Sequence, residues 1–354
     1  MKIIPILGTL VILAGAPVGI YLFLGKSAGT EPRVEKPIRV GTRIYRWDIK
    51  APMPTPRTEV AAAALKGKIY VVGGIDGLFR VLTAVEVYDP KTDSWERAPD
   101  LPEGRHHASA VALQDKLYVI GGFGDLAFTQ NKADVLVFDP ETKRWERRAP
   151  LPVARGALGS AVIGERIYAV AGIEEGGRGS RAERLEEGLY ERLKERLSAR
   201  LEVYDPAADR WAQKRDAPTK RDHLAAATID GLLFVAGGRQ AWPDKKLSIL
   251  EIYNPDTDEW RLGTAMPTPR GGVAGVALGG FFIVIGGGDS EKDLPAVEAY
   301  NPKLNTWLAL PGLPTARHGL AAIPIGNTLY VIGGSKGKER RFSVSNSNEA
   351  LVVE

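Results

Sequence analysis

The chain has no cysteine, three methionines and four histidines among its 354 residues. The absence of cysteine excludes disulfide bonds, thiolate metal sites and cysteine nucleophiles. Neither sign of charge dominates, because 47 Lys and Arg stand against 43 Asp and Glu, and this small surplus predicts no nucleic-acid surface. The sequence also lacks nucleophile-elbow, phosphate-loop and paired-carboxylate motifs. Several large classes of enzyme are therefore not indicated.

What the sequence contains in quantity is apolar residues and turn residues. It is 44% hydrophobic and 25% charged, which is typical of a globular protein with a large core. Its 40 Gly and 24 Pro indicate many turns. The length allows about two domains or one closed all-β unit.

The first long feature is an apolar stretch at residues 3–24, which carries no charged side chain. At about 1.5 Å rise per residue, a helix of this length crosses a hydrocarbon core of about 30 Å. The alternative is a signal peptide cleaved after Ala16, but Pro17 would then be the first mature residue. We therefore predict that residues 1–25 form an uncleaved transmembrane anchor.

Residues 26–42 are polar, aperiodic and contain proline, so they are predicted to be a tether. Lys2 precedes the apolar stretch, whereas Lys26, Arg33, Lys36 and Arg39 follow it. A positive-inside count would place the domain that follows in the cytoplasm. The very short N-terminal head instead favours translocation of that domain. The expectation is a single-pass membrane protein with its folded domain on the extracytoplasmic side.

A four-part unit recurs about every 50 residues along the rest of the chain. It consists of Pro-x-x-Arg, an apolar run ending in a glycine doublet, an aromatic-Asx-Pro turn, and a tryptophan. The doublets stand at 73–74, 121–122, 171–172 (where the first residue is Ala171), 237–238, 286–287 and 333–334. The aromatic-Asx-Pro turns begin at Tyr88, Phe138, Tyr204, Tyr253 and Tyr300, and the tryptophans are Trp95, Trp145, Trp211, Trp260 and Trp307.

These units resemble the kelch repeat, and the resemblance covers residues 43–354. It implies an all-β fold, a six-bladed β-propeller with four strands in each blade. The residues agree, because each unit contains four short β-prone runs separated by turn chemistry. The sequence therefore predicts one monomeric propeller.

The sixth unit has no tryptophan after its third strand, but Trp47 stands before the first unit. The segment Arg43 to Ile49 leads into Pro52 to Arg57, just as every other tryptophan strand leads into the next Pro-x-x-Arg. N-terminal and C-terminal strands are therefore predicted to share one blade. This arrangement would close the ring and leave no open edge.

The third unit is longer than the others because of an insertion at residues 174–199. Ser180 with Glu183 forms a capping-box pattern. A stripe of leucines follows at intervals of four, namely Leu185, Leu189, Leu193 and Leu197. The pattern predicts an amphipathic helix that packs on the propeller rim or, alternatively, serves as a lid or docking helix.

Strand alternation places the Pro-x-x-Arg loops and the loops between second and third strands on one face. We call this face the mouth. The candidate ligand-binding arginines there are Arg57, Arg105, Arg155, Arg221, Arg270, Arg317 and Arg239. The candidate histidines, one or two places after these arginines, are His106, His107, His223 and His318.

Two interpretations of the arginines are open. They either fix a carboxylate, phosphate or acidic peptide, or hold the blades together by pairing with acidic residues of the facing loops. The acidic candidates are Asp76, Asp125, Glu174 and Asp289. A three-histidine metal site is conceivable because units two, four and six lie about 120° apart, but convergence on one ion is demanding. The sequence prediction is no metal and no cofactor.

The favoured function is a membrane-anchored binding module for a protein or an anionic small molecule, with catalysis left open. Among kelch proteins, the copper radical oxidases need a cysteine that this chain lacks. The alternative is a carbohydrate-active enzyme resembling the sialic acid mutarotases (N-acetylneuraminate epimerases), which also carry a helical insertion in blade three. Their proposed acid–base carboxylate follows the doublet of the fourth blade, where this chain has Arg239 and then Asp244.

Overall fold

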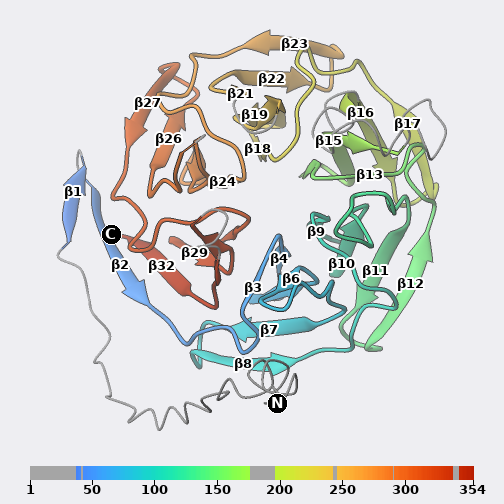
Figure 1. Ribbon diagram of the computed structural model, residues 1–354. Coiled ribbons are helices and arrows are strands. Elements are labelled where there is room, and N and C mark those ends of the chain that lie inside the picture. The colour runs from blue at the N-terminus through green and yellow to red at the C-terminus, as the bar shows by residue number, and fades with distance from the viewer. Residues whose placement is uncertain (1–36, 41–42, 176–195, 242–244, 290, 338–342) are drawn as a thin grey trace, which may run out of the picture. The chain divides into compact units, whose positions relative to one another are not determined.

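The computed structural model describes residues 37–40, 43–175, 196–241, 245–289, 291–337 and 343–354. In residues 43–354, six antiparallel sheets, the blades, are arranged around a common axis (Figure 1). Blades one to three contain β4 (Ala61–Leu65), β5 (Lys68–Val72), β7 (Val85–Asp89) and β8 (Ser94–Arg97); β9 (Ser109–Leu113), β10 (Lys116–Ile120), β11 (Val135–Asp139) and β12 (Arg144–Arg148); and β14 (Gly159–Ile163), β15 (Arg166–Glu174), β16 (Leu197–Asp205) and β17 (Arg210–Gln213).

Blades four to six repeat the pattern. They contain β18 (Ala225–Ile229), β19 (Leu232–Ala236), β22 (Leu250–Asn254) and β23 (Glu259–Leu262); β24 (Ala274–Leu278), β25 (Phe281–Ile285), β26 (Val297–Asn301) and β27 (Thr306–Ala309); and β28 (Ala321–Ile325), β29 (Thr328–Ile332), β32 (Asn348–Val353) and β2 (Arg43–Ile49). The predicted all-β six-bladed propeller is confirmed.

Ring closure follows the predicted route. Strand β2 pairs with β32 so that Trp47 lies opposite Leu351. Trp47 is buried, and its indole nitrogen donates a hydrogen bond to the carbonyl of Pro311 at 3.1 Å. Strand β1 (Ile38–Val40) adds a fifth strand outside β2, so this part of the predicted tether 26–42 is paired backbone.

The repeated tryptophans connect neighbouring blades. Trp95 lies opposite Tyr88 across β7 and β8, and its indole N–H donates to the carbonyl of Ala51 at 2.8 Å. The same type of bond to a backbone carbonyl is made by Trp145, Trp211, Trp260 and Trp307. These tryptophan hydrogen bonds therefore link each blade to the one before it.

The hydrophobic core is divided among the interfaces between blades. One cluster joins Ile69 and Val71 of blade one to Ile323 and Ile332 of blade six. Similar clusters lie between the other adjacent blades. The innermost strands carry small residues such as Ala61 and Ala225, because strands near the axis have little room between them.

The ends of the blade-three insertion are strand, not helix. Ile173 of β15 pairs with Leu197 of β16, and the buried Leu197 packs with Phe123. The prediction of a helix over 174–199 is therefore wrong for Glu174 and for residues 197–199. Its remaining core, residues 176–195, lies outside the described residues.

The predicted anchor, residues 1–25, also lies outside the described residues. In the part of the chain that the structure describes, no helix has the length and apolar character needed to span a bilayer.

The prediction that the Pro-x-x-Arg loops and the second-to-third loops open on the same face is confirmed. Strand β3 (Arg57–Thr58) in the loop leading into the first strand of blade one pairs with β6 (Ile75–Asp76) in its second-to-third loop. In blade three, β13 (Arg155–Gly156) pairs with β15. Equivalent bridges in the other blades are His106 with Phe123, Asp222 with Arg239, Gly271 with Gly288, and His318 with Ser335. Both kinds of loop therefore open at the mouth.

Candidate functional site: a ring of loop residues around the axis

The six Pro-x-x-Arg arginines are buried, with at most 1% of their surface exposed. Each guanidinium forms an ion pair with a carboxylate on, or directly before, the third strand of its own blade. The pairs are Arg57 with Glu86, Arg105 with Asp134, Arg155 with Glu202, Arg221 with Glu251, Arg270 with Glu298, and Arg317 with Glu349. The guanidinium groups also donate to strand carbonyls, as in the 2.9 Å bond from Arg270 to Val284.

This burial differs from the expectation that these arginines line an open mouth. A guanidinium taken out of water needs acceptors, and the third-strand carboxylates and strand carbonyls supply most of them. The exceptions are the Nε atoms of Arg57, Arg105 and Arg155, which are buried and have no hydrogen-bond partner among the described residues. Burial lowers the pKa of Arg270, and the charge of Glu298 opposes this shift. The loop acids expected as partners are engaged elsewhere: Asp76 pairs with Arg80, and Glu174 with Arg200.

The arginine backbone joins each blade to its neighbour. Gly74, the second residue of a glycine doublet, donates its N–H to the carbonyl of Arg105 in the next blade at 2.9 Å. The same bond recurs from Gly122, Gly172, Gly238, Gly287 and Gly334 to the arginine of the following blade. A Cβ on Gly73 would collide with the Arg105 carbonyl oxygen, so glycine at this position permits the close approach of the two blades.

Two places after each arginine stands a residue with positive φ, between +52° and +70°. We call these six residues the axial ring: Glu59, His107, Ala157, His223, Gly272 and Gly319. Each donates its N–H to the carbonyl of the ring residue in the preceding blade, at 2.8–3.1 Å. The six bonds form a closed circle, because Glu59 accepts from His107 and itself donates to Gly319.

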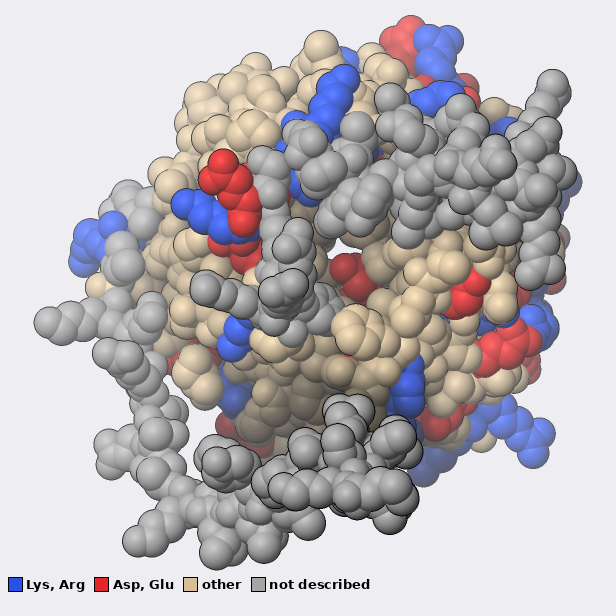
Figure 2. Space-filling view, in the orientation of Figure 1, with Lys and Arg blue, Asp and Glu red and all other residues tan. Residues whose placement is uncertain are grey.

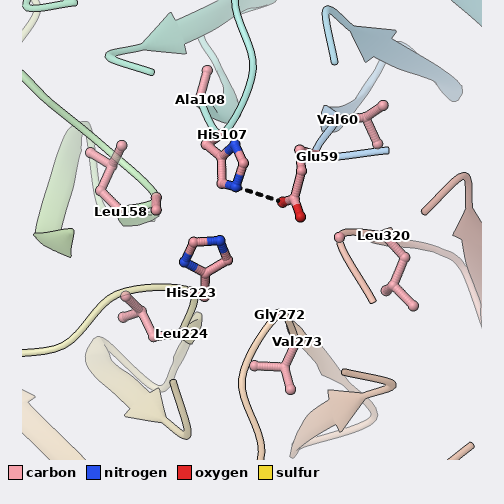
Figure 3. A pocket seen from close by; sticks show the side chains of 12 residues that line it. Glu59, Val60, His107, Ala108, Leu158, His223, Leu224, Gly272, Val273 and Leu320 are labelled. Atoms are coloured by element: carbon pink, nitrogen blue, oxygen red, sulfur yellow. Dashed lines mark ion pairs between the residues drawn. The ribbon is translucent and has the colours of Figure 1, made fainter. Parts of the chain in front are cut away.

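The axial ring lines a cavity of about 90 Å³. Viewed from one end of the axis, an opening lies at the centre of the disc, with acidic atoms visible beside it (Figure 2). Inside, the polar ends of Glu59, His107 and His223 turn toward one another (Figure 3). Nε2 of His107 lies 3.2 Å from Oε2 of Glu59. Gly319 makes room for that carboxylate, since a Cβ there would approach it to 2.6 Å.

His106 and His107 form a buried pair. Nε2 of His106 lies 2.9 Å from the carbonyl oxygen of Asp125, and its Nδ1 contacts Nδ1 of His107. Burial lowers the pKa of His106. Burial, followed by the nearby His223, lowers the pKa of His107 well below the ordinary value. Both shifts favour the neutral form of the imidazole.

His223 is held from two sides. Nδ1 of His223 lies 3.1 Å from Oδ1 of Asp222, but the angles of this contact are not those of a hydrogen bond. Nε2 of His223 lies 3.3 Å from a terminal guanidinium nitrogen of Arg239. Arg239 also donates from Nε to Asp222 at 2.7 Å. Burial alone would raise the pKa of Asp222, but the Arg239 charge outweighs this and lowers it.

The structure brings some of the predicted residues together and separates others. The rings of His107 and His223 lie with centroids 4.7 Å apart, and Arg239 joins them. His318 instead binds Asp293 through Nδ1 at 2.7 Å and Ser335 through Nε2 at 3.0 Å. The three blades that carry histidines therefore do not supply a three-histidine set. Asp244, which follows Arg239 in the sequence after the fourth doublet, lies outside the described residues.

Sequence reasoning missed Glu59 and Asp222. The signal was available, because Glu59 occupies the same place after Arg57 that His107 occupies after Arg105. Asp222 likewise corresponds to His106. Aligning the repeats on their arginines, rather than searching for histidines, would have found both.

A second feature of the mouth is an exposed apolar loop tip. Leu78 is 74% exposed and Phe79 is 58% exposed in the second-to-third loop of blade one. The loop is well defined, since Asp76 accepts hydrogen bonds from the backbone N–H groups of Leu78 and Arg80. Leu126, in the corresponding loop of blade two, is 40% exposed.

Comparison with known proteins agrees with this architecture. A family model for the KLHDC2/KLHL20/DRC7 Kelch-repeats domain matches residues 39–172 and 191–334. The gap between the two matched segments, residues 173–190, overlaps the first part of the blade-three insertion at 174–199.

Curated relatives match over shorter segments. The chain is 45% identical over 56 residues to the F-box/kelch-repeat protein At5g03020 of Arabidopsis thaliana, covering 15% of this chain and 16% of that protein. It is 36% identical over 87 residues to Kelch-like protein 26 of Danio rerio, covering 23% and 14%. It is 54% identical over 50 residues to Kelch-like protein 30 of Homo sapiens, covering 14% and 8%. The matches thus span a small part of each relative's length.

Among solved structures, that of YjhT superposes with a TM-score of 0.71. The match covers 86% of this chain and 99% of that chain at 17% identity. At this identity, the likeness concerns the fold alone.

Proposed function

Because the chain belongs to the KLHDC2/KLHL20/DRC7 Kelch-repeats domain family, we propose that it is a binding module that engages a partner protein through the mouth of its propeller. Kelch domains generally mediate protein interactions. The observation that carries the proposal is the exposed pair Leu78 and Phe79 on a loop ordered by Asp76. Exposed aromatic and aliphatic side chains on a rigid support are typical of interface anchors.

The burial of the six arginines favours a protein over a small anion as the ligand. An anion would need exposed guanidinium groups, whereas these groups are buried and each already forms an ion pair with a carboxylate. A partner protein would instead bury the apolar tips of the blade-one and blade-two loops. Removing apolar surface from water stabilises such an interface by roughly 25 cal/mol per Å² before the costs of association.

The test compares two matched leucines on opposite faces. Leu78 lies at the mouth, whereas Leu304, 69% exposed, lies in the turn between β26 and β27 on the other face. Proteins crosslinked to the full-length chain in cells are compared for wild type, Leu78→Asp with Phe79→Asp, and Leu304→Asp. A partner retained by Leu304→Asp and lost by the mouth variant supports the proposal. Equal capture by all three contradicts it.

We further propose that residues 1–25 anchor this module in a membrane, with the propeller on the extracytoplasmic side. The uncharged stretch 3–24 supports this proposal. The full-length chain should resist extraction by high salt and carbonate, and protease should reach the propeller in intact spheroplasts. A soluble product that begins at Pro17 would exclude the anchor, and protection from protease would reverse the orientation.

A mutarotase-type activity is the second candidate. The observation in its favour is the contact between Glu59 and His107 inside the axial cavity, which places a carboxylate beside a neutral imidazole. Against it, Arg239 stands where the resemblance places a carboxylate and is held by Asp222. NMR exchange spectroscopy of sialic acid anomers decides the question: unchanged exchange rates with added protein exclude this activity.

A further inference from the structure

We propose that Glu59, His107 and His223 form a binding site for one divalent first-row transition metal ion, such as Zn²⁺, on the axis of the propeller. The inference does not depend on the proposed partner-binding function. It also revises the sequence prediction of no metal site, which considered only the histidines.

The donor atoms are close enough to converge on one ion. One carboxylate oxygen of Glu59 and one ring nitrogen from each of His107 and His223 lie within 4.8 Å of one another. Two donors about 2.1 Å from one tetrahedral ion lie about 3.4 Å apart. The 3.2 Å separation of Glu59 and His107 matches this spacing, and the His223 donor lies within 4.8 Å of both.

The hydrogen-bond chain leaves a lone pair on His107. A carbonyl oxygen only accepts, so Nε2 of His106 carries a proton toward Asp125. The contact between the two Nδ1 atoms holds one proton between the rings. With no further proton on the pair, Nε2 of His107 presents its lone pair to the Glu59 carboxylate 3.2 Å away. An imidazole lone pair facing a carboxylate oxygen needs a proton or a cation between them.

His223 is oriented in the same way by different neighbours. The Asp222 carboxylate beside Nδ1 favours the tautomer that carries its proton there, and the guanidinium of Arg239 at Nε2 only donates. Nε2 therefore holds the lone pair, and Figure 3 shows a ring nitrogen of His223 directed toward His107 and Glu59. A carboxylate behind a histidine ligand is typical of metal sites.

The surroundings provide charge and space for an ion. Glu59 and Asp222 contribute two carboxylates against the single charge of Arg239, which competes for His223. Gly272 and Gly319 give two of the six ring positions no side chain. The cavity of about 90 Å³ leaves room for an ion with bound water, so the site would have an open coordination position.

The experiment titrates the full-length chain, prepared without a histidine tag, with Zn²⁺ in competition with a chromogenic chelator at pH 7.5. Co²⁺ serves as a second probe, since its visible absorption reports the coordination number. The expected result is one ion per chain with a Kd of about 1 µM or tighter. Absence of stoichiometric binding of both ions overturns the proposal outright.

Variants then test the donor set. Glu59→Gln, His107→Gln and His223→Gln should each weaken binding by at least about 100-fold, and Asp222→Asn by about 10-fold. Arg239→Gln should strengthen binding, because it removes the competing cation. The matched control is His318→Gln, a mouth histidine outside the donor set, which should change the affinity less than about twofold.

The remaining outcomes are also decisive. If ligand variants that retain the wild-type melting curve bind Zn²⁺ as tightly as wild type, the ion is bound elsewhere and the proposal fails. If His318→Gln weakens binding as much as His107→Gln, the assigned donor set is wrong. A variant that fails to fold is replaced by its alanine counterpart, and the Co²⁺ spectrum of wild type still decides whether an imidazole–carboxylate site exists.

Discussion

Two positions in the same six loops differ in almost every respect. The first is arginine in every blade, buried and paired with an acid of its own blade. The second, two residues later in the axial ring, is Glu59, His107, Ala157, His223, Gly272 and Gly319 in turn. The backbone is the same at all six, with positive φ and one bond to the previous blade. The difference teaches that the repeated position holds the scaffold, whereas the varied position decides which side chains line the axial cavity.

The largest effect should come from removing one repeated element completely. Deleting residues 1–42 leaves β2 in place, and we expect a protein that unfolds cooperatively. Deleting residues 1–50 removes β2 with Trp47 and exposes the edge of β32, so aggregation or loss of cooperativity is expected. Circular dichroism melting curves compare the two variants. Equal melting temperatures would contradict the role of Trp47 in closure.

The next largest effect concerns the repeated arginine. Arg221→Met should lower the free energy of unfolding by about 3–5 kcal/mol, because it leaves the buried carboxylate of Glu251 without a counter-charge and with only the Thr219 hydroxyl as a donor. The control is Arg166→Met, which breaks a partly exposed ion pair with Asp205 and should cost less than about 1 kcal/mol. Urea denaturation measures both. If Arg221→Met changes the free energy of unfolding as little as Arg166→Met does, the repeated arginine does not support the scaffold.

A smaller effect should appear as a pH dependence arising from the varied position. The folded-state pKa values of His106 and His107 lie below the unfolded value of about 6.5, so protonation favours the unfolded chain. Stability should be full above about pH 6.5 and fall at lower pH by up to about 1.4 kcal/mol per pH unit for each histidine. Denaturation series with a chelator present measure the slope. Replacing both residues by Gln should reduce it, whereas an unchanged slope would assign it to other groups.

The smallest effect distinguishes two glycines of similar backbone conformation. Gly319 and Gly326 have φ of +61° and +59°, but only at Gly319 would a Cβ meet neighbours, the nearest being Thr58 Oγ1 at 2.5 Å. Gly326→Ala should cost about 1 kcal/mol from backbone strain alone. Gly319→Ala should cost more and displace the carboxylate of Glu59. Thermal melts compare the two, and equal costs would mean that Glu59 does not depend on this space.

The sequence predicted the scaffold well because its signals are repeated and local. Trp47 was identifiable as the missing tryptophan of the sixth unit, and β2 does pair with β32. The partners of the arginines were also present in the sequence: Glu86, Glu251 and Glu298 each stand two places before a Tyr-Asx-Pro turn. The sequence analysis considered the acids of the facing loops instead. Strand alternation shows on which side of the propeller a loop opens, but not toward which carboxylate an arginine side chain extends.

The candidate site was harder to predict because it depends on contacts between blades far apart in the chain. Glu59 and His223 are separated by 164 positions and meet only because the ring closes. The separation of His318 from the other histidines depends on Asp293, which lies in another blade. Neither contact has a signature within one repeat, so the sequence indicated the loops but not which side chains converge.

The circle of hydrogen bonds around the axis has a direction of its own. Every N–H in it points toward the preceding blade, so the six hydrogen bonds follow one another in a single rotational sense. None of these donors is left to face the channel. The same backbone circle is present with Glu, His, Ala and Gly at its six positions, so the side chain at each position, and not the backbone, decides what lines the channel.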